Sequence, residues 1–177
     1  MRILPFPLFL TSLFLFSGLS LHAIESKGAI IIASMEGQVI VTNNESGADL
    51  PSDRIKVGGL LFDGHTVKTG AGSKVVLLFS SGTITTLKEG SVLNIKKFAQ
   101  QKFDPKTTGK LSGRKDEPSP SDTVIDLSLG DMIIDVKKLK KESSFNIDSP
   151  VGTAGIRGTI PRIQVAKLPG GGFNKTT

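Results

Sequence analysis

Short stretches in which apolar and polar residues alternate, separated by glycine-centred turns, fill the sequence from Ala29 onward. A period of two places successive side chains on opposite faces of a β-strand, and no segment keeps the 3.6-residue period of an amphipathic helix. Asp63-Gly64 and Ser81-Gly82 place glycine where a hairpin needs positive φ. The pattern predicts an all-β domain, an antiparallel sandwich or barrel-like fold built from short strands.

We expect strands at residues 30–33, 38–42, 65–69, 74–79, 83–87, 92–98, 124–129, 132–137, 144–147 and 158–165. Gly130-Asp131 is expected to form the turn between two of them. Residues 99–122 are polar and rich in Pro, Gly and Ser, so we expect a long flexible loop there. Residues 166–177 are expected to form a disordered tail. The domain itself is then expected to span residues 24–165.

The beginning of the chain has the pattern of a secretory signal peptide over residues 1–23. Met1 and Arg2 precede an apolar run over residues 3–21, and small residues follow near its end. Cleavage after Ser20 or after Ala23 is open, and an uncleaved N-terminal anchor is the alternative to cleavage. No later segment is long and apolar enough to span a membrane. We therefore expect a periplasmic or secreted protein of a Gram-negative-type bacterium, with no transmembrane segment after cleavage.

The composition argues against most enzymes and metal proteins. The chain has no Cys, Trp or Tyr and two His, of which His22 lies in the expected leader. Disulfide frameworks, thiolate metal sites and multi-histidine sites are excluded, and we expect no metal and no cofactor. Ser–His–Asp catalysis would depend on His65 alone. A glycosidase pair of Asp126 with Asp131 or Asp135 would lack aromatic platforms for a sugar. We expect that the protein is not an enzyme.

Two segments carry motifs of a known family. The first, residues 63–93, combines Asp-Gly, Thr-Gly-Ala-Gly-Ser, an apolar run, Gly-Thr and Gly-Ser. The second, residues 129–136 and 149–159, contains Ser-Pro-Val and ends in Ala-Gly-Ile-Arg-Gly-Thr. Together they resemble the FecR domain, the periplasmic sensing module of iron-citrate-type bacterial signalling proteins. The resemblance implies an all-β envelope domain that senses or binds a partner without catalysis, here as an exported single-domain variant.

Arg157 is the first candidate binding residue. It lies between Ile156 and Gly158, so we expect part of its side chain to be buried, and a buried guanidinium needs a partner. A structural ion pair is favoured over an exposed ligand-binding role. Arg157→Ala is then expected to lower stability by leaving a carboxylate unpaired. The carboxylates available on nearby strands are Asp126, Asp131, Asp135 and Asp148.

The other candidate binding residues form a basic cluster of Lys137, Lys138, Lys140 and Lys141. One interpretation is contact with an anionic glycan or a lipid headgroup. The favoured one is a solvated turn that protects a strand edge. The chain has a formal net charge of +6, but no Trp or Tyr lies among the lysines, so we expect no nucleic-acid partner.

These features together predict an exported, non-enzymatic binding or scaffold module of the cell envelope that recognises a protein or an anionic polysaccharide. Recognition is expected to use strand edges and the loop at residues 99–122. The strand at residues 158–165 would present an unpaired edge, to which a partner or a second copy adds a strand, giving a homo-oligomer. The alternative is a periplasmic signal-transduction component that relays the occupancy of an outer-membrane receptor.

Overall fold

The structure, a computed structural model, describes residues 26–177. The expected signal peptide, residues 1–23, lies outside the described residues. Almost all regular structure is β-strand, which confirms the expected all-β, antiparallel fold. The helical turns are α1 (Pro105–Thr108) and a 3₁₀ turn at Leu111–Gly113. No helix of the described part is long and apolar enough to cross a membrane.

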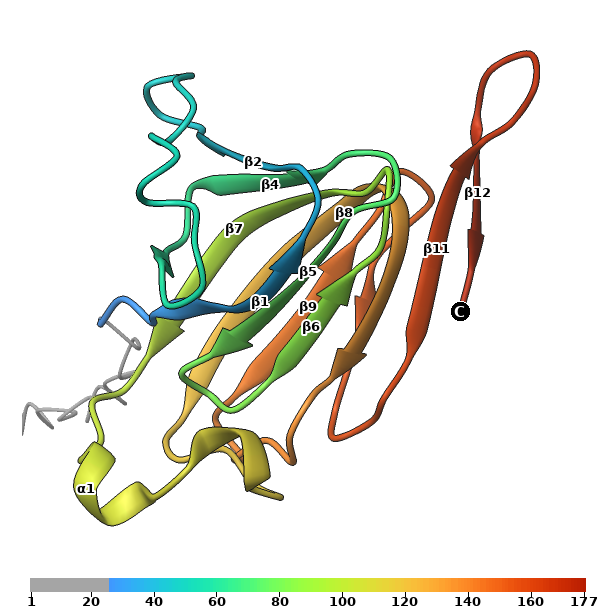
Figure 1. Ribbon diagram of the computed structural model, residues 1–177. Coiled ribbons are helices and arrows are strands. Elements are labelled where there is room, and N and C mark those ends of the chain that lie inside the picture. The colour runs from blue at the N-terminus through green and yellow to red at the C-terminus, as the bar shows by residue number, and fades with distance from the viewer. Residues whose placement is uncertain (1–25) are drawn as a thin grey trace, which may run out of the picture.

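The strands lie in two curled sheets that pack face to face as a half-barrel (Figure 1). The first sheet holds β2 (Val39–Asn43), β4 (His65–Thr69), β7 (Val92–Gln100), the first half of β8 (Ser121–Asp135), β9 (Ser144–Asp148) and β10 (Ala154–Gly155). The second holds β3 (Leu60–Leu61), β1 (Ile30–Glu36), β5 (Lys74–Phe79), β6 (Ile84–Leu87), the second half of β8, β11 (Arg162–Lys167) and β12 (Phe173–Thr176).

Strand β8 joins the two sheets because it curves from one into the other (Figure 1), and its pairing partners change between Leu129 and Gly130. Its first half pairs with β7 and, in parallel, with β9, whereas its second half pairs with β6 and β11. The turn expected at Gly130-Asp131 is therefore a bend within one strand, whose two halves lie in different sheets and do not pair as a hairpin. Gly130 adopts φ 102°, a conformation that side chains disfavour.

The core lies between the two sheets and is made of the inward-facing residues of nearly every strand. Phe79 lies at its centre, with ring centroids 5.1 Å from Phe98 and 6.5 Å from Phe145, both in edge-to-face arrangements. Ile30, Leu77, Ile125 and Met132 are among the fully buried residues around these rings. Period-two alternation thus places one face of each sheet in the core, as the sequence predicts.

The segment between β7 and β8 departs from the sequence-based boundaries. β7 extends to Gln100 and β8 begins at Ser121, so the connection is shorter than residues 99–122. Its second part is attached to the rest of the fold: Asp116 forms a β-bridge with Lys138, in the turn after β8, and Glu117 is fully buried. That the loop is flexible stays a prediction.

The end of the chain also differs from expectation. Residues 166–177 are expected to be disordered, whereas the structure places Phe173–Thr176 in β12, paired antiparallel with β11. Three consecutive glycines, residues 170–172, all adopt positive φ and close this hairpin, and Phe173 packs against the core. The unpaired edge expected at residues 158–165 is therefore wrong, because β11 pairs with β8 on one side and with β12 on the other.

Candidate functional site

Arg157 is exposed and does not form the expected ion pair. Its Nη2 donates a hydrogen bond to the carbonyl oxygen of Ser143 at 3.2 Å, and no carboxylate of the described residues lies within ion-pair distance of it. The expectation that Arg157→Ala leaves a carboxylate unpaired is therefore wrong. The four nearby Asp residues pair instead with Lys88, Lys96, Lys137 and Arg162.

The four lysines of the predicted cluster do not act alike. Lys137 is only 8% exposed, and its Nζ lies 2.6 Å from an Asp135 carboxylate oxygen, so its charge is neutralised within the chain. Lys138, Lys140 and Lys141 are exposed. Three of the four predicted lysines thus remain available to an outside partner.

The fold adds cations to this cluster that the sequence analysis did not single out. Lys138 N donates to the carbonyl oxygen of Lys115 at 3.0 Å, which brings Arg114 and Lys115 beside the lysine cluster. Val136 N donates to the carbonyl oxygen of Thr159 at 3.1 Å, which brings residues 158–160 to the same place. These segments surround a shallow hollow of about 310 Å³, lined by Arg114, Lys115, Lys137, Lys138, Thr159 and Ile160 among others.

A buried carboxylate holds this region together. Glu117 is fully buried and accepts hydrogen bonds from Ser121 Oγ at 2.6 Å, from the backbone N of Lys140 at 2.6 Å and from Ser143 Oγ. It therefore joins the 114–120 segment to the start of β8 and to the turn before β9. A buried carboxylate with three donors around it is costly to remove, so Glu117 fixes the position of the neighbouring cations.

A second surface is apolar and lies on the outer face of the second sheet. Ile31 pairs with Leu60 on β3 and with Leu78 on β5, and Leu78 pairs with Ile84 on β6, so one register row crosses four strands. Val76 and Ile133 follow in the next row, on either side of Thr86. We call these outward residues the apolar face: Ile31, Leu60, Val76, Leu78, Ile84 and Ile133. Leu60 is 47% and Ile31 37% exposed, and the other four side chains are partly exposed.

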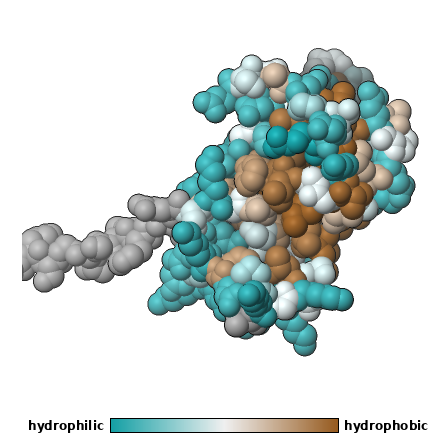
Figure 2. Space-filling model, turned by 60° about the vertical axis from the view of Figure 1, so that its left-hand side comes forward, coloured by the Kyte–Doolittle hydropathy of each residue, from teal (hydrophilic) through white to brown (hydrophobic). Residues whose placement is uncertain are grey.

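Figure 2 shows a broad hydrophobic area on one face of the molecule, with hydrophilic surface above and below it. The outer face of the first sheet differs in chemistry. Its central row holds Thr66, Asn94 and Asp126, and Asn44 Nδ2 donates to Asn94 Oδ1 at 2.9 Å across it. Scattered apolar residues are normal on a protein surface, but a contiguous apolar face marks an interaction site.

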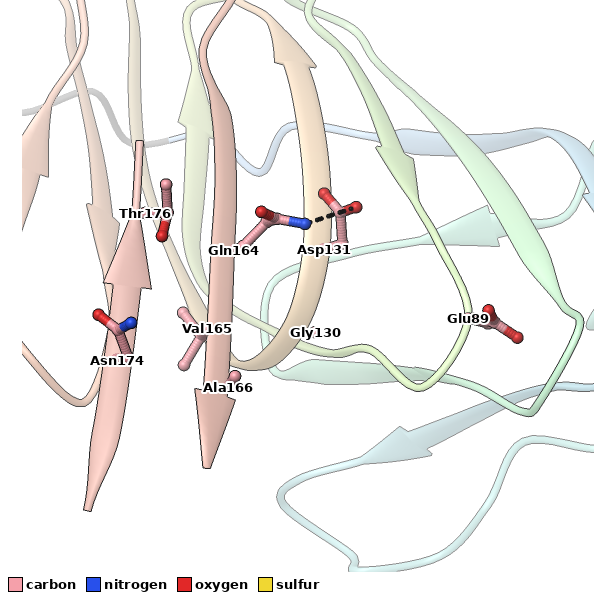
Figure 3. A pocket seen from close by; sticks show the side chains of 8 residues that line it. All are labelled: Glu89, Gly130, Asp131, Gln164, Val165, Ala166, Asn174 and Thr176. Atoms are coloured by element: carbon pink, nitrogen blue, oxygen red, sulfur yellow. Dashed lines mark hydrogen bonds between the residues drawn. The ribbon is translucent and has the colours of Figure 1, made fainter. Parts of the chain in front are cut away.

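The hollow beside β11 and β12 is lined mainly by polar residues, among them Asp131, Gln164 and Asn174 (Figure 3). Asp131 accepts hydrogen bonds from Arg162 Nη2 at 2.5 Å and from Gln164 Nε2 at 3.2 Å, and Lys88 Nζ lies 3.2 Å away. The Arg162 hydrogen bond and the Lys88 charge lower the pKa of Asp131 to about 2. A carboxylate held ionised between two cations is not a general acid at neutral pH.

The carboxylate pair considered for glycoside hydrolysis does not form. Asp126 lies on the first sheet, next to Asp148 of β9, and Lys96 Nζ lies 3.8 Å from the first carboxylate and 3.0 Å from the second. Asp131 and Asp135 lie in the second half of β8, which belongs to the other sheet. A hydrogen bond from Thr153, and then one from Lys96, lowers the pKa of Asp148.

His65 is buried, and its Nδ1 accepts a hydrogen bond from the backbone N of Phe62 at 3.2 Å. Burial, and then the charge of Arg54, lowers the pKa of His65, so its ring is neutral at pH 7. No serine hydroxyl of residues 26–177 hydrogen-bonds to it. Within the same residues, no group of three His, Asp or Glu side chains could hold a metal ion.

Comparison with known proteins identifies the family of this chain. A family model described as FecR protein matches residues 65–171, from β4 to the turn before β12. No curated protein and no solved structure gave a significant match. FecR is a family of non-enzymatic, signalling-related domains of the cell envelope. The match covers more than half of the chain and includes both motif segments that carry the resemblance, apart from Asp63-Gly64, so this chain belongs to the FecR protein family.

Proposed function

We propose that this chain is an exported, non-enzymatic binding module of the bacterial cell envelope that recognises a partner protein through the apolar face. The observation that carries the proposal is the apolar row of Leu60, Ile31, Leu78 and Ile84 across four strands, whose first two members are exposed and whose other two are partly exposed. Membership in a family of signalling-related envelope domains supports both the place and the absence of catalysis.

The charges around the apolar face indicate the chemistry of the partner. Glu36 pairs with Lys74, Asp131 with Lys88 and Arg162, and Asp135 with Lys137. Because each of these cations is paired with a carboxylate of the chain, the rim offers little free charge to an anionic polysaccharide. A protein surface that is itself apolar and weakly charged fits best, since burying apolar area gives roughly 25 cal/mol per Å².

The relay of outer-membrane receptor occupancy is a second candidate, supported by the family match. Such a relay also needs a surface that contacts another protein, and the apolar face supplies one. The two candidates differ in the identity of that protein, which is a receptor component in the relay.

A photo-crosslinking amino acid at Leu60 is expected to give one discrete protein adduct in intact envelopes. The same label at Lys68, an exposed position on the first sheet, is the matched control and is expected to give none. The captured protein, once purified, should bind the unlabelled chain. That binding should weaken at least about tenfold in Ile31→Glu, because a charge is placed in an apolar contact, and stay unchanged in Lys68→Glu. Equal binding by the two variants would refute the apolar face as the contact.

A further inference from the structure

The positive charge of this protein is concentrated at one end. Ten Lys and Arg residues and four Asp and Glu residues lie in three segments, residues 101–117, 136–144 and 156–160. The rest of the chain holds twelve of each kind and is therefore neutral. We call these three segments the basic end; in Figure 1 they form the lower end of the molecule, around α1 and the turns that follow it.

The cations of the basic end come from separate parts of the chain and converge on one hollow. Arg114, Lys115 and Lys138 line it together with Ile160, and its volume is about 310 Å³. The side chains of Lys115, Lys138, Lys140 and Lys141 are exposed and form no ion pair with any carboxylate in the described part of the chain. Charges left unpaired on one surface attract an anionic partner.

An exposed apolar side chain stands among these cations. Ile160 is 68% exposed, more than any other large hydrophobic residue of the described chain. Its neighbours around the hollow include Lys115 and Lys138. An apolar side chain flanked by lysines suits a lipid surface, where the cations meet phosphate headgroups and the side chain enters the acyl boundary. A hydrated polysaccharide has no apolar layer for Ile160, and the chain has no Trp or Tyr on which a sugar could stack.

We propose that the basic end binds the surface of a membrane that contains anionic phospholipids, with Lys115 and Lys138 at the headgroups and Ile160 inserted between them. This surface adjoins the apolar face at the Asp135–Lys137 pair but shares no residue with it. The inference therefore goes beyond the proposed protein-binding function and stands or falls independently of it.

Sedimentation with vesicles tests the proposal. The chain of residues 24–177 is expected to bind vesicles of phosphatidylcholine with about one-third phosphatidylglycerol at about 0.1 M NaCl, and not vesicles of phosphatidylcholine alone. Each lysine near an anionic surface raises the affinity for it roughly fivefold. The double variant Lys115→Glu/Lys138→Glu should therefore bind the vesicles at least about 25-fold more weakly. Ile160→Ser should bind about fivefold more weakly, because its apolar contact is lost.

The double variant Lys56→Glu/Lys68→Glu is the matched control, because it changes the net charge equally at exposed positions outside the basic end. It should retain binding within about twofold. Two results would overturn the proposal. One is an equal loss in both double variants, which would mean that only net charge matters. The other is binding to dextran sulfate as tight as to the vesicles, with Ile160→Ser unchanged on both, which would assign the surface to polyanionic glycans.

Discussion

Gly130→Ala is expected to lower the free energy of unfolding by about 4 kcal/mol, because two penalties add at the bend of β8. At φ 102° any side chain is strained, and a Cβ would lie 2.4 Å from Ser91 Cα and 2.2 Å from Ser91 Oγ. Ser91 belongs to the turn between β6 and β7, and its Oγ accepts a hydrogen bond from Asp131 N at 3.0 Å. The β6–β7 turn and the bend of β8 both connect one sheet with the other. They therefore pack against each other at this point, and neither has room to move.

Gly90→Ala is the matched control for this prediction. Gly90 also has positive φ, at 63°, but a Cβ there meets nothing within 4 Å. Its replacement should cost about 1 kcal/mol, from backbone strain alone. Urea unfolding followed by circular dichroism measures both variants. Equal losses of unfolding free energy in the two variants would show that the contact between Gly130 and Ser91 is not tight. They would argue against close packing of the β6–β7 turn on the bend of β8.

Glu117→Ala is expected to lower the free energy of unfolding by about 3 kcal/mol, since it removes the acceptor of three hydrogen bonds and leaves a cavity. Ser121 Oγ, Ser143 Oγ and the backbone N of Lys140 would lose a buried partner. Glu117→Gln keeps one carbonyl oxygen as an acceptor and should lose about half as much. Hydrogen exchange should also accelerate over residues 114–120, because Glu117 joins them to β8 and to the turn before β9.

Glu142→Ala is the control, because Glu142 is exposed and belongs to the turn before β9 that Glu117 contacts. Loss of an exposed carboxylate that forms no ion pair within residues 26–177 should change stability by less than about 0.5 kcal/mol. If Glu117→Ala matched this control in urea unfolding, the 114–120 segment would not be held by the buried carboxylate.

Much of the fold follows from alternation alone. The strand at residues 65–69 is a period-two run that ends before Gly70, and the strand at residues 74–79 is a continuous apolar run that ends before Ser80. Both therefore have the bounds that the sequence predicts. β3 and β10 are two residues long and leave no periodic signal. β12 follows three glycines, and its order depends on pairing with β11, which local propensity does not encode.

The candidate surfaces were harder to predict because they depend on long-range contacts. The run of Val75 to Phe79 is apolar on both faces, a pattern typical of a strand covered on both sides. The sequence therefore indicated that the outward side chains of β5, which belong to the apolar face, are apolar. For the basic end, the sequence indicated the lysine cluster at residues 137–141 but not the contribution of Arg114 and Lys115. Lys115 joins Lys138 only because Glu117 is buried against Ser143, and a polar, proline-rich segment favours disorder until that contact is known. Burial of Lys137 likewise depends on Asp135 beside it.

The central claim is that the second sheet presents an uncovered apolar face, and methyl NMR with a soluble paramagnetic agent tests it most directly. Methyl signals of Ile31 and Leu60 should broaden strongly. Signals of their sequence neighbours Ile30, Ile32 and Leu61 should remain sharp, because these side chains are fully buried. Protection of Ile31 and Leu60 equal to that of the buried neighbours, in the isolated chain, would show that the face is already covered and would contradict the account.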